Sequence, residues 1–201
     1  FDLAHPDHGR RAYLEKHIPG AIHVDLNRDL SEIPGKRGRH PLPSREAFTE
    51  NARTWGLNNG SRVVCYDQDV GIFAARLWWM LRWIGHGSIC VLNGGLVAWE
   101  NAGGKTNHGE SKTPNKGDFE LSPTLTRLCY TNELPDKSRV LLDARDADRF
   151  SGRKDPIDAV AGHIPGAVNA PFTENIDGEK FLPAVQLRER FEVLGVHGDI
   201  V

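Results

Sequence analysis

The sequence predicts an α/β protein made of two copies of one unit, each with a mostly parallel central sheet flanked by helices. Three observations lead to this prediction: a short segment that occurs twice, strands that alternate with helices, and turn residues at matching places. The repeated segment is His-Ile-Pro-Gly-Ala, at residues 17–21 and again at residues 163–167. An identity of this length that contains His, Pro and Gly is improbable by chance, so we interpret it as an internal duplication.

A helix is predicted after the repeated segment in each copy, over residues 44–55 and residues 184–194. Ser44 is a suitable N-cap for the first of these helices, because its hydroxyl can accept a hydrogen bond from a free N–H of the first turn. Gly56 and Gly195 follow the two helices, where a helix C-terminus favours a residue that tolerates positive φ.

Short apolar runs predict the strands. In the first copy they cover residues 62–66 and 88–92, with a helix over residues 72–84 between them and a last short helix over residues 96–101. In the second copy the run over residues 139–143 predicts a strand ahead of the repeated segment. Because strands alternate with helices, the sheets are expected to be mostly parallel and covered on both faces.

We expect three parts along the chain: a first domain over residues 1–104, a linker over residues 105–118 and a second domain over residues 119–201. The linker is rich in Gly, Lys, Asn, Ser and Thr and has no hydrophobic periodicity. Comparison of the copies indicates that the first domain lacks its first strand. It also indicates that the second contains only its N-terminal half, because the strand predicted from Asp199 has no successor.

Composition excludes several classes of protein. The net charge is −2, whereas a nucleic-acid-binding protein usually carries a clear basic excess. No apolar run approaches the roughly 18 residues that predict a membrane span. The three cysteines are odd in number and lack a Cys-x-x-Cys pair, so neither a disulfide framework nor a metal site is expected. We expect no cofactor, and reduced thiols in a cytoplasmic protein.

Several longer motifs point to one family. The chain resembles the two-domain thiosulfate and 3-mercaptopyruvate sulfurtransferases, in which two rhodanese-like domains occur in tandem. The matching stretches span nearly the whole chain in family order. They are Gly38-Arg39-His40-Pro41-Leu42-Pro43, Ala74-Ala75-Arg76-Leu77-Trp78-Trp79, Leu81-Arg82-Trp83-Ile84-Gly85-His86, Val91-Leu92-Asn93-Gly94-Gly95, Trp99, Asp143-Ala144-Arg145, Arg149-Phe150-Ser151-Gly152 and both His-Ile-Pro-Gly-Ala segments.

The resemblance implies a sulfurtransferase that takes a sulfane sulfur from a small anionic donor, thiosulfate or 3-mercaptopyruvate. A cysteine of the second domain would carry the sulfur as a persulfide and pass it to cyanide or to a thiol, including that of a thioredoxin-like protein. The first copy has Asp67 at the end of its strand, where an active copy has the cysteine. Aligning Val201 with Val64 places the nucleophile roughly three residues beyond Val201. The chain as given is therefore expected to be inactive.

The donor is an anion, so an arginine is expected beside the nucleophile, since a guanidinium donates two parallel hydrogen bonds to such groups. The resemblance implies Arg149 as this substrate-binding residue, and Arg153 as a candidate for the second arginine of mercaptopyruvate enzymes. The thiolate itself needs stabilisation, because a free thiol has a pKa of about 8.5. A loop that opens a helix supplies backbone N–H groups for this.

Other functions remain open at this point. A rhodanese-like domain without the cysteine would be a non-catalytic binding or regulatory module, and a longer loop ending in Arg would indicate a phosphatase. Cys65 and Cys90 lie in apolar strands and are interpreted as buried, inert thiols, whereas Cys129 lies in a loop and is expected to be exposed. His17 and His163 are interpreted as structural residues that hydrogen-bond locally.

Overall fold

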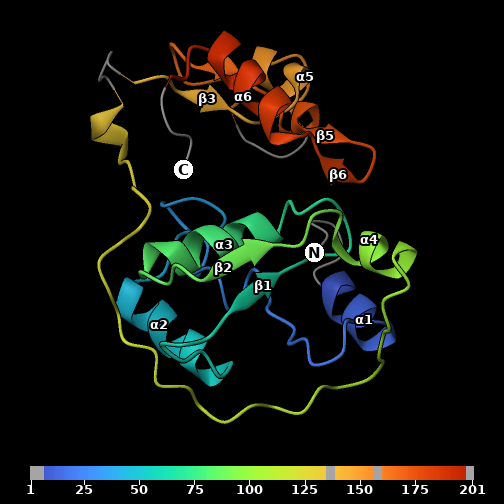
Figure 1. Ribbon diagram of the computed structural model, residues 1–201. Coiled ribbons are helices and arrows are strands. Elements are labelled where there is room, and N and C mark those ends of the chain that lie inside the picture. The colour runs from blue at the N-terminus through green and yellow to red at the C-terminus, as the bar shows by residue number, and fades with distance from the viewer. Residues whose placement is uncertain (1–6, 135–138, 156–159, 198–201) are drawn as a thin grey trace. The chain divides into compact units, whose positions relative to one another are not determined.

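The chain folds into two compact units, Phe1–Arg127 and Leu128–Val201, which are described separately (Figure 1). The computed structural model describes residues 7–134, 139–155 and 160–197. The strand expected from Asp199 lies outside these residues.

The first unit contains four helices and two strands in its described part. These elements are α1 (His8–Glu15), α2 (Arg45–Thr54), β1 (Val63–Cys65), α3 (Ala74–Trp83), β2 (Ile89–Val91) and α4 (Gly95–Asn101). The strands pair in parallel, with Val64 opposite Cys90, and α3 packs against both of them. The mixed α/β architecture with parallel strands is therefore confirmed, and the predicted helices and strands are found within one or two residues of their expected bounds.

Local sequence signals account for α2 and α3. The Ser44 hydroxyl accepts a hydrogen bond from the Ala47 N–H at 3.1 Å, so it caps α2 as predicted. The apolar stripe of α3 places Met80, Leu81 and the following Ile84 in the core, where Met80 and Ile84 are fully buried. The sequence pattern of both helices is thus satisfied by the packing of this unit.

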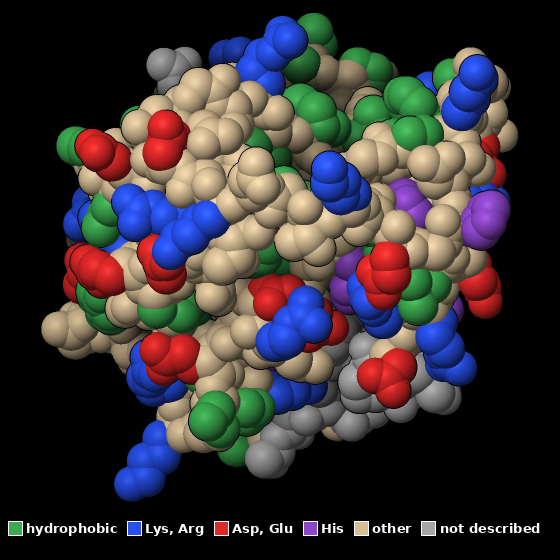
Figure 2. Space-filling model, turned by 90° about the horizontal axis from the view of Figure 1, so that it is seen from below, with side chains coloured by type: hydrophobic (Ala, Val, Ile, Leu, Met, Phe, Trp, Pro, Cys, Tyr) green, Lys and Arg blue, Asp and Glu red, His purple; other side chains and the backbone are tan. Residues whose placement is uncertain are grey.

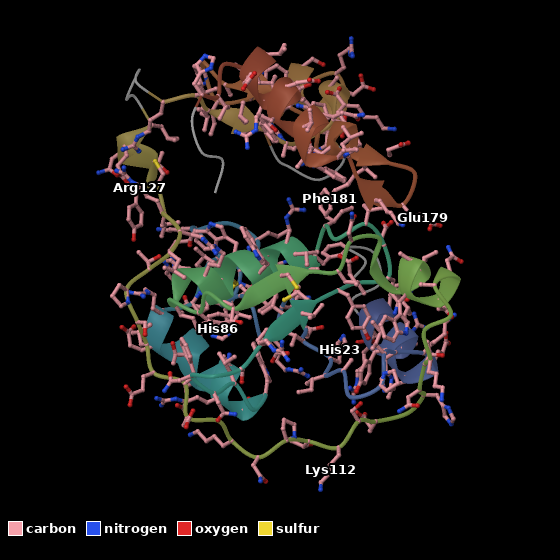
Figure 3. All side chains as sticks on the ribbon, viewed as in Figure 1. His23, His86, Lys112, Arg127, Glu179 and Phe181 are labelled. Carbon is pink, nitrogen blue, oxygen red and sulfur yellow. The ribbon has the colours of Figure 1, made fainter. Side chains whose placement is uncertain are left out.

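The residues expected to form a linker instead pack on the first unit. Figure 1 shows residues 105–127, here called the strap, running around this unit. The side chain of Lys112 points away from it (Figure 3). Backbone hydrogen bonds fasten the strap along its length. They join His17 and Asn107 in both directions (2.9 and 2.8 Å), Gly109 to Leu14 (2.7 Å), Gly117 to Arg53 (2.8 Å), Phe119 to Leu57 (3.1 Å), Ser122 to Ile84 (3.0 Å) and Leu125 to Arg82 (3.0 Å).

The domain boundary therefore differs from the expected one, because residues 105–127 belong to the first unit. A single extended segment buries few of its side chains, so its sequence has the polar composition of a linker. Phe119 is the exception: it is 3% exposed, and its ring meets His86 edge-on at 5.5 Å between centroids. A Cβ on Gly117 would collide with the Leu57 carbonyl, so the close approach of the strap requires glycine there.

The second unit is smaller and more open. Its elements are η1 (Thr131–Glu133), β3 (Leu142–Asp143), α5 (Ala147–Ser151), β4 (Val168–Asn169), η2 (Phe172–Asn175), β5 (Ile176–Asp177), β6 (Lys180–Phe181) and α6 (Ala184–Val193). Strands β3 and β4 pair in parallel, as predicted, while β5 and β6 form an antiparallel hairpin that the sequence analysis did not predict. Large apolar side chains remain exposed, among them Val140, Val168 and Val185.

The two His-Ile-Pro-Gly-Ala segments have the same local structure. His17 Nδ1–H donates to the Tyr13 carbonyl at 2.8 Å and its ring stacks on Tyr13 at 4.3 Å. His163 Nδ1–H donates to the Phe150 carbonyl at 2.7 Å and its ring stacks on Phe150 at 3.8 Å. In both segments the glycine has positive φ, 81° and 85°. Each histidine thus ties the repeated segment to an aromatic residue of a preceding helix, which confirms the expected local hydrogen bonding. In the described residues a strand, β4, directly follows the second segment but none directly follows the first.

Within residues 7–134, 139–155 and 160–197, no helix is both long and apolar enough to cross a membrane. On the face seen in Figure 2, basic and acidic side chains are interspersed and do not gather into patches of one sign.

Because Phe119 is the buried side chain of the strap, its replacement should make the first unit less stable. Replacing Phe119 by Ala leaves a cavity beside His86 and should lower the free energy of unfolding by about 3 kcal/mol. All five tryptophans lie in the first unit, so urea unfolding followed by tryptophan fluorescence reports on this unit. The control is Leu121→Ala on the same strap, where the side chain is 37% exposed and a loss below about 1 kcal/mol is expected. Equal losses for both variants would show that the strap is not anchored through Phe119.

Candidate active site

The loop between β1 and α3 gathers backbone N–H groups around one negative charge. Asp67 follows β1, and its Oδ1 accepts hydrogen bonds from the N–H groups of Asp69 (3.1 Å) and Gly71 (3.0 Å). Its Oδ2 accepts from those of Phe73 (2.9 Å) and Ala74 (3.1 Å), at the beginning of α3. Four donors thus converge on one carboxylate, and the positive end of the helix dipole lies behind them.

A glycine holds this loop against the turn after β2. The Leu96 N–H donates to the Asp67 carbonyl at 3.0 Å, and Gly95 lies directly against the loop. A Cβ on Gly95 would stand 2.7 Å from the Asp67 carbonyl oxygen and would also collide with that of Asp69. The Asn-Gly-Gly motif after β2 therefore fixes the loop that surrounds Asp67.

A cavity of about 190 Å³ lies beside this loop in the first unit. Its lining is mostly apolar and includes Tyr13, Cys65 and Phe73, with Asp25, Asp67 and His23 as polar members. Burial lowers the pKa of His23, so its imidazole is neutral near pH 7. A neutral histidine and two carboxylates do not attract an anion, so this copy is poorly suited to bind the expected donor.

None of the three cysteines takes the place of Asp67 on this loop. Cys65 is the last residue of β1 and is 3% exposed, and burial raises the pKa of its thiol to about 12, with a further contribution from Cys90. The expectation that Cys90 is buried was wrong: it is exposed, because it lies on the same open face of the sheet as Val64, which is 56% exposed. Cys129 is exposed, as expected, and Arg139 donates to its sulfur at 3.2 Å.

In the second unit, Arg149 lies on α5 with its side chain only 20% exposed. The Asp146 side chain caps this helix by accepting a hydrogen bond from the Arg149 N–H at 2.9 Å. The Arg149 Nε lies 3.4 Å from Oδ1 of Asp155, whose side chain is 1% exposed. His163 stacks on Phe150, the next residue along α5, and hydrogen-bonds to its carbonyl. The repeated segment therefore also stabilises the helix that carries Arg149.

A second arginine joins this cluster, and it is Arg145. Its NH1 lies 3.4 Å from Oδ2 of Asp155, and its NH2 donates to Asp143 at 2.6 Å and to the Gly162 carbonyl at 2.7 Å. The hydrogen bond from Arg145 lowers the pKa of Asp143, so this carboxyl is ionised at neutral pH. In the sequence, Arg145 stands out only as part of the Asp-Ala-Arg motif, and no local signal marks Asp155.

Arg153 has a different setting. It donates to Asp148 at 2.6 Å, and both side chains are largely exposed, at 69% and 56%. The structure therefore brings Arg149 and Arg145 together around Asp155, while Arg153 belongs to a surface ion pair. Among residues 7–134, 139–155 and 160–197 no group of three or more His, Cys, Asp or Glu side chains is arranged to hold a metal ion.

Removal of the Asp67 carboxylate should make the first unit much less stable. Asp67→Ala removes the acceptor of four backbone N–H groups and should lower the free energy of unfolding by roughly 2–4 kcal/mol. Tryptophan fluorescence during urea unfolding measures this. Asp69→Ala is the matched control, because the Asp69 side chain is exposed, and a change within about 0.5 kcal/mol is expected. A loss for Asp67→Ala as small as the control's would show that the four hydrogen bonds do not hold the loop.

Comparisons with known proteins point to one family. The rhodanese-like domain family matches residues 2–102. A probable 3-mercaptopyruvate sulfurtransferase of Pseudomonas aeruginosa is 45% identical over 202 residues, covering 96% of this chain and 71% of the relative. A putative thiosulfate sulfurtransferase of Mycobacterium tuberculosis is 43% identical over 176 residues, covering 84% of this chain and 61% of the relative.

Solved structures agree with these relatives. The 3-mercaptopyruvate sulfurtransferase of Leishmania major matches 96% of this chain with a TM-score of 0.85 and 32% identity, over 56% of its own length. The chain thus spans between 56% and 71% of the length of these three proteins. With the parallel α/β fold, the charge-holding loop after β1 and the two His-Ile-Pro-Gly-Ala segments, these similarities show that the chain belongs to the rhodanese family, together with the 3-mercaptopyruvate and thiosulfate sulfurtransferases.

Proposed function

We propose that this chain is part of a sulfurtransferase that moves a sulfane sulfur from thiosulfate or 3-mercaptopyruvate to cyanide or a thiol, including a thiol of a thioredoxin-like protein. The sulfur would travel as a persulfide on a cysteine that follows Val201 in the full-length protein. The observation that carries this proposal is the loop after β1, where four backbone N–H groups converge on one negative charge. The free state of all three cysteines supports a reducing, cytoplasmic location.

Sulfur transfer needs such a loop at two steps, when the cysteine attacks the donor as a thiolate and when it leaves as a thiolate. With thiosulfate, the cysteine thiolate attacks the outer sulfur, the S–S bond breaks, and sulfite leaves with the electron pair. The resulting persulfide is then attacked at its outer sulfur by cyanide or by an acceptor thiolate, and the cysteine leaves again as a thiolate. Backbone N–H groups stabilise the cysteine sulfur whenever it is negatively charged, without contributing a proton of their own.

The two copies have different tasks in this proposal. In the first, the Asp67 carboxylate occupies the N–H groups permanently, so no thiol or donor can use them. In the second, Arg149 supplies the positive charge for the donor, and its position on a capped helix beside Phe150 supports this role. Thiosulfate is the first donor to test, because Asp148 already engages Arg153, the candidate for a second donor-binding arginine.

A thiosulfate:cyanide assay tests the function directly. The 201-residue chain should form thiocyanate no faster than a buffer control, whereas the full-length protein should form it catalytically. Enzyme-like rates from the 201-residue chain would contradict the expected position of the nucleophile. Absence of activity with both donors in the full-length protein would favour a non-catalytic binding module.

Arg149→Ala in the full-length protein should raise the KM for thiosulfate. The variant loses charge-assisted hydrogen bonds worth about 1.5–3 kcal/mol, which corresponds to a rise of roughly ten- to a hundredfold. Initial rates over a range of thiosulfate concentrations give this value. Arg188→Ala, an exposed arginine of α6, controls for the loss of one positive charge and should leave KM unchanged. An unaltered KM in Arg149→Ala would remove this residue from the donor site.

A further inference from the structure

A buried carboxylate lies between the two arginines of the second unit. The Asp155 side chain is 1% exposed, and a carboxylate at such a site is stable only with cationic partners. Each oxygen of the Asp155 carboxylate faces a different arginine: Oδ2 lies 3.4 Å from Arg145 NH1, and Oδ1 lies 3.4 Å from Arg149 Nε. Asp155 thus forms an ion pair with the Nε edge of the Arg149 guanidinium, and this contact is not a hydrogen bond.

Arg145 is the fixed side of this arrangement. Its NH2 donates to Asp143 at 2.6 Å and to the Gly162 carbonyl at 2.7 Å, and its Nε donates to Asp143 at 3.0 Å. These contacts join β3 to the segment before the second His-Ile-Pro-Gly-Ala. A guanidinium with this many contacts cannot rotate. Arg145 therefore fixes the position of the Asp155 carboxylate that it contacts.

From this geometry we propose that Asp155 is a positioning residue, which orients the Arg149 guanidinium for the anionic donor. The inference rests on the proposed function, because it assigns Asp155 a task through Arg149. A guanidinium is planar, so an ion pair at its Nε edge favours one orientation of the plane in which its other N–H groups point. With this contact in place, the guanidinium is closer to its productive orientation before a donor binds.

Asp155 also has an electrostatic effect on donor binding, opposite to its effect through orientation. Its negative charge offsets part of the positive charge of Arg149, so by charge alone its removal would strengthen donor binding. Orientation and charge therefore predict KM changes of opposite sign. Orientation should dominate, because two parallel hydrogen bonds to an anion require correct geometry as well as charge.

Asp155→Asn in the full-length protein separates these effects. An amide keeps the shape but has one acceptor oxygen, so its NH2 group must face one of the two arginines, donor against donor. The KM for thiosulfate should rise about tenfold with kcat within about twofold, and the melting temperature shows whether the variant is folded. A purely structural role would lower the fraction of active enzyme, and hence the apparent kcat, at unchanged KM. Unchanged or lower KM would overturn the proposal.

A double-mutant cycle tests whether Asp155 acts through Arg149. Lysine lacks the Nε–H edge, so Arg149→Lys should raise KM, and adding Asp155→Asn should change it by less than about twofold. Multiplicative effects would overturn the proposal. Asp155→Glu keeps the charge and both oxygens and should hold KM within about threefold of the wild type. If Asp155→Asn fails to fold, Asp155→Glu replaces it in the cycle, and its smaller rise should vanish in Arg149→Lys.

Glu174→Gln serves as the control, since Glu174 pairs with Arg190 in the same unit with a largely exposed side chain, and its KM should equal that of the wild type. Failure of the proposed function has a different signature. It appears as absent transfer by the wild type, or as an unchanged KM in Arg149→Ala, and either result removes the Asp155 role as well. A raised KM in Arg149→Ala together with a normal KM in Asp155→Asn overturns the Asp155 role alone.

Discussion

Four backbone N–H groups donate hydrogen bonds to the Asp67 carboxylate. These hydrogen bonds hold the loop between β1 and α3, whose N–H groups would otherwise lack acceptors. A loop that points several N–H groups inward at the end of a parallel strand is costly unless a negative charge accepts them. Asp67 supplies this charge from within the chain. Much of the neighbouring structure follows from it: α3 begins at the donors, and the glycine after β2 leaves room for the loop.

In the proposed enzyme, the same constraint would allow one inactive and one active copy. A loop of this shape needs a negative charge, and more than one chemical group can supply it. An aspartate makes the loop a permanent structural element, whereas a cysteine would make it a site whose charge changes during sulfur transfer. In the proposed enzyme, the first copy contributes stability and the second contributes chemistry.

The second unit shows how a structural motif can serve a site. His163 stacks on Phe150, and Phe150 is adjacent to Arg149 on α5. In the first unit, His17 makes the same contacts with Tyr13, and the residue before Tyr13 is Ala12, not an arginine. The duplicated segment therefore secures a helix in both units. In the second unit, Arg145 and Asp155 add charged contacts beside this helix, and we propose that they orient the Arg149 guanidinium.

The sequence by itself determined the α/β class, the repeated segment, the helices with clear caps and stripes, and Arg149 as a candidate, because these depend on local spacing and on motifs. Tertiary structure decided the rest. Residues 105–127 have the composition of a linker yet pack on the first unit, since their hydrogen bonds use backbone groups that every sequence possesses. Cys90 is exposed because an apolar strand does not reveal which of its faces is covered. The pairing of Asp155 with Arg145 and Arg149, rather than with Arg153 two residues away, depends on where the chain turns after α5. Local spacing along the sequence does not reveal this turn.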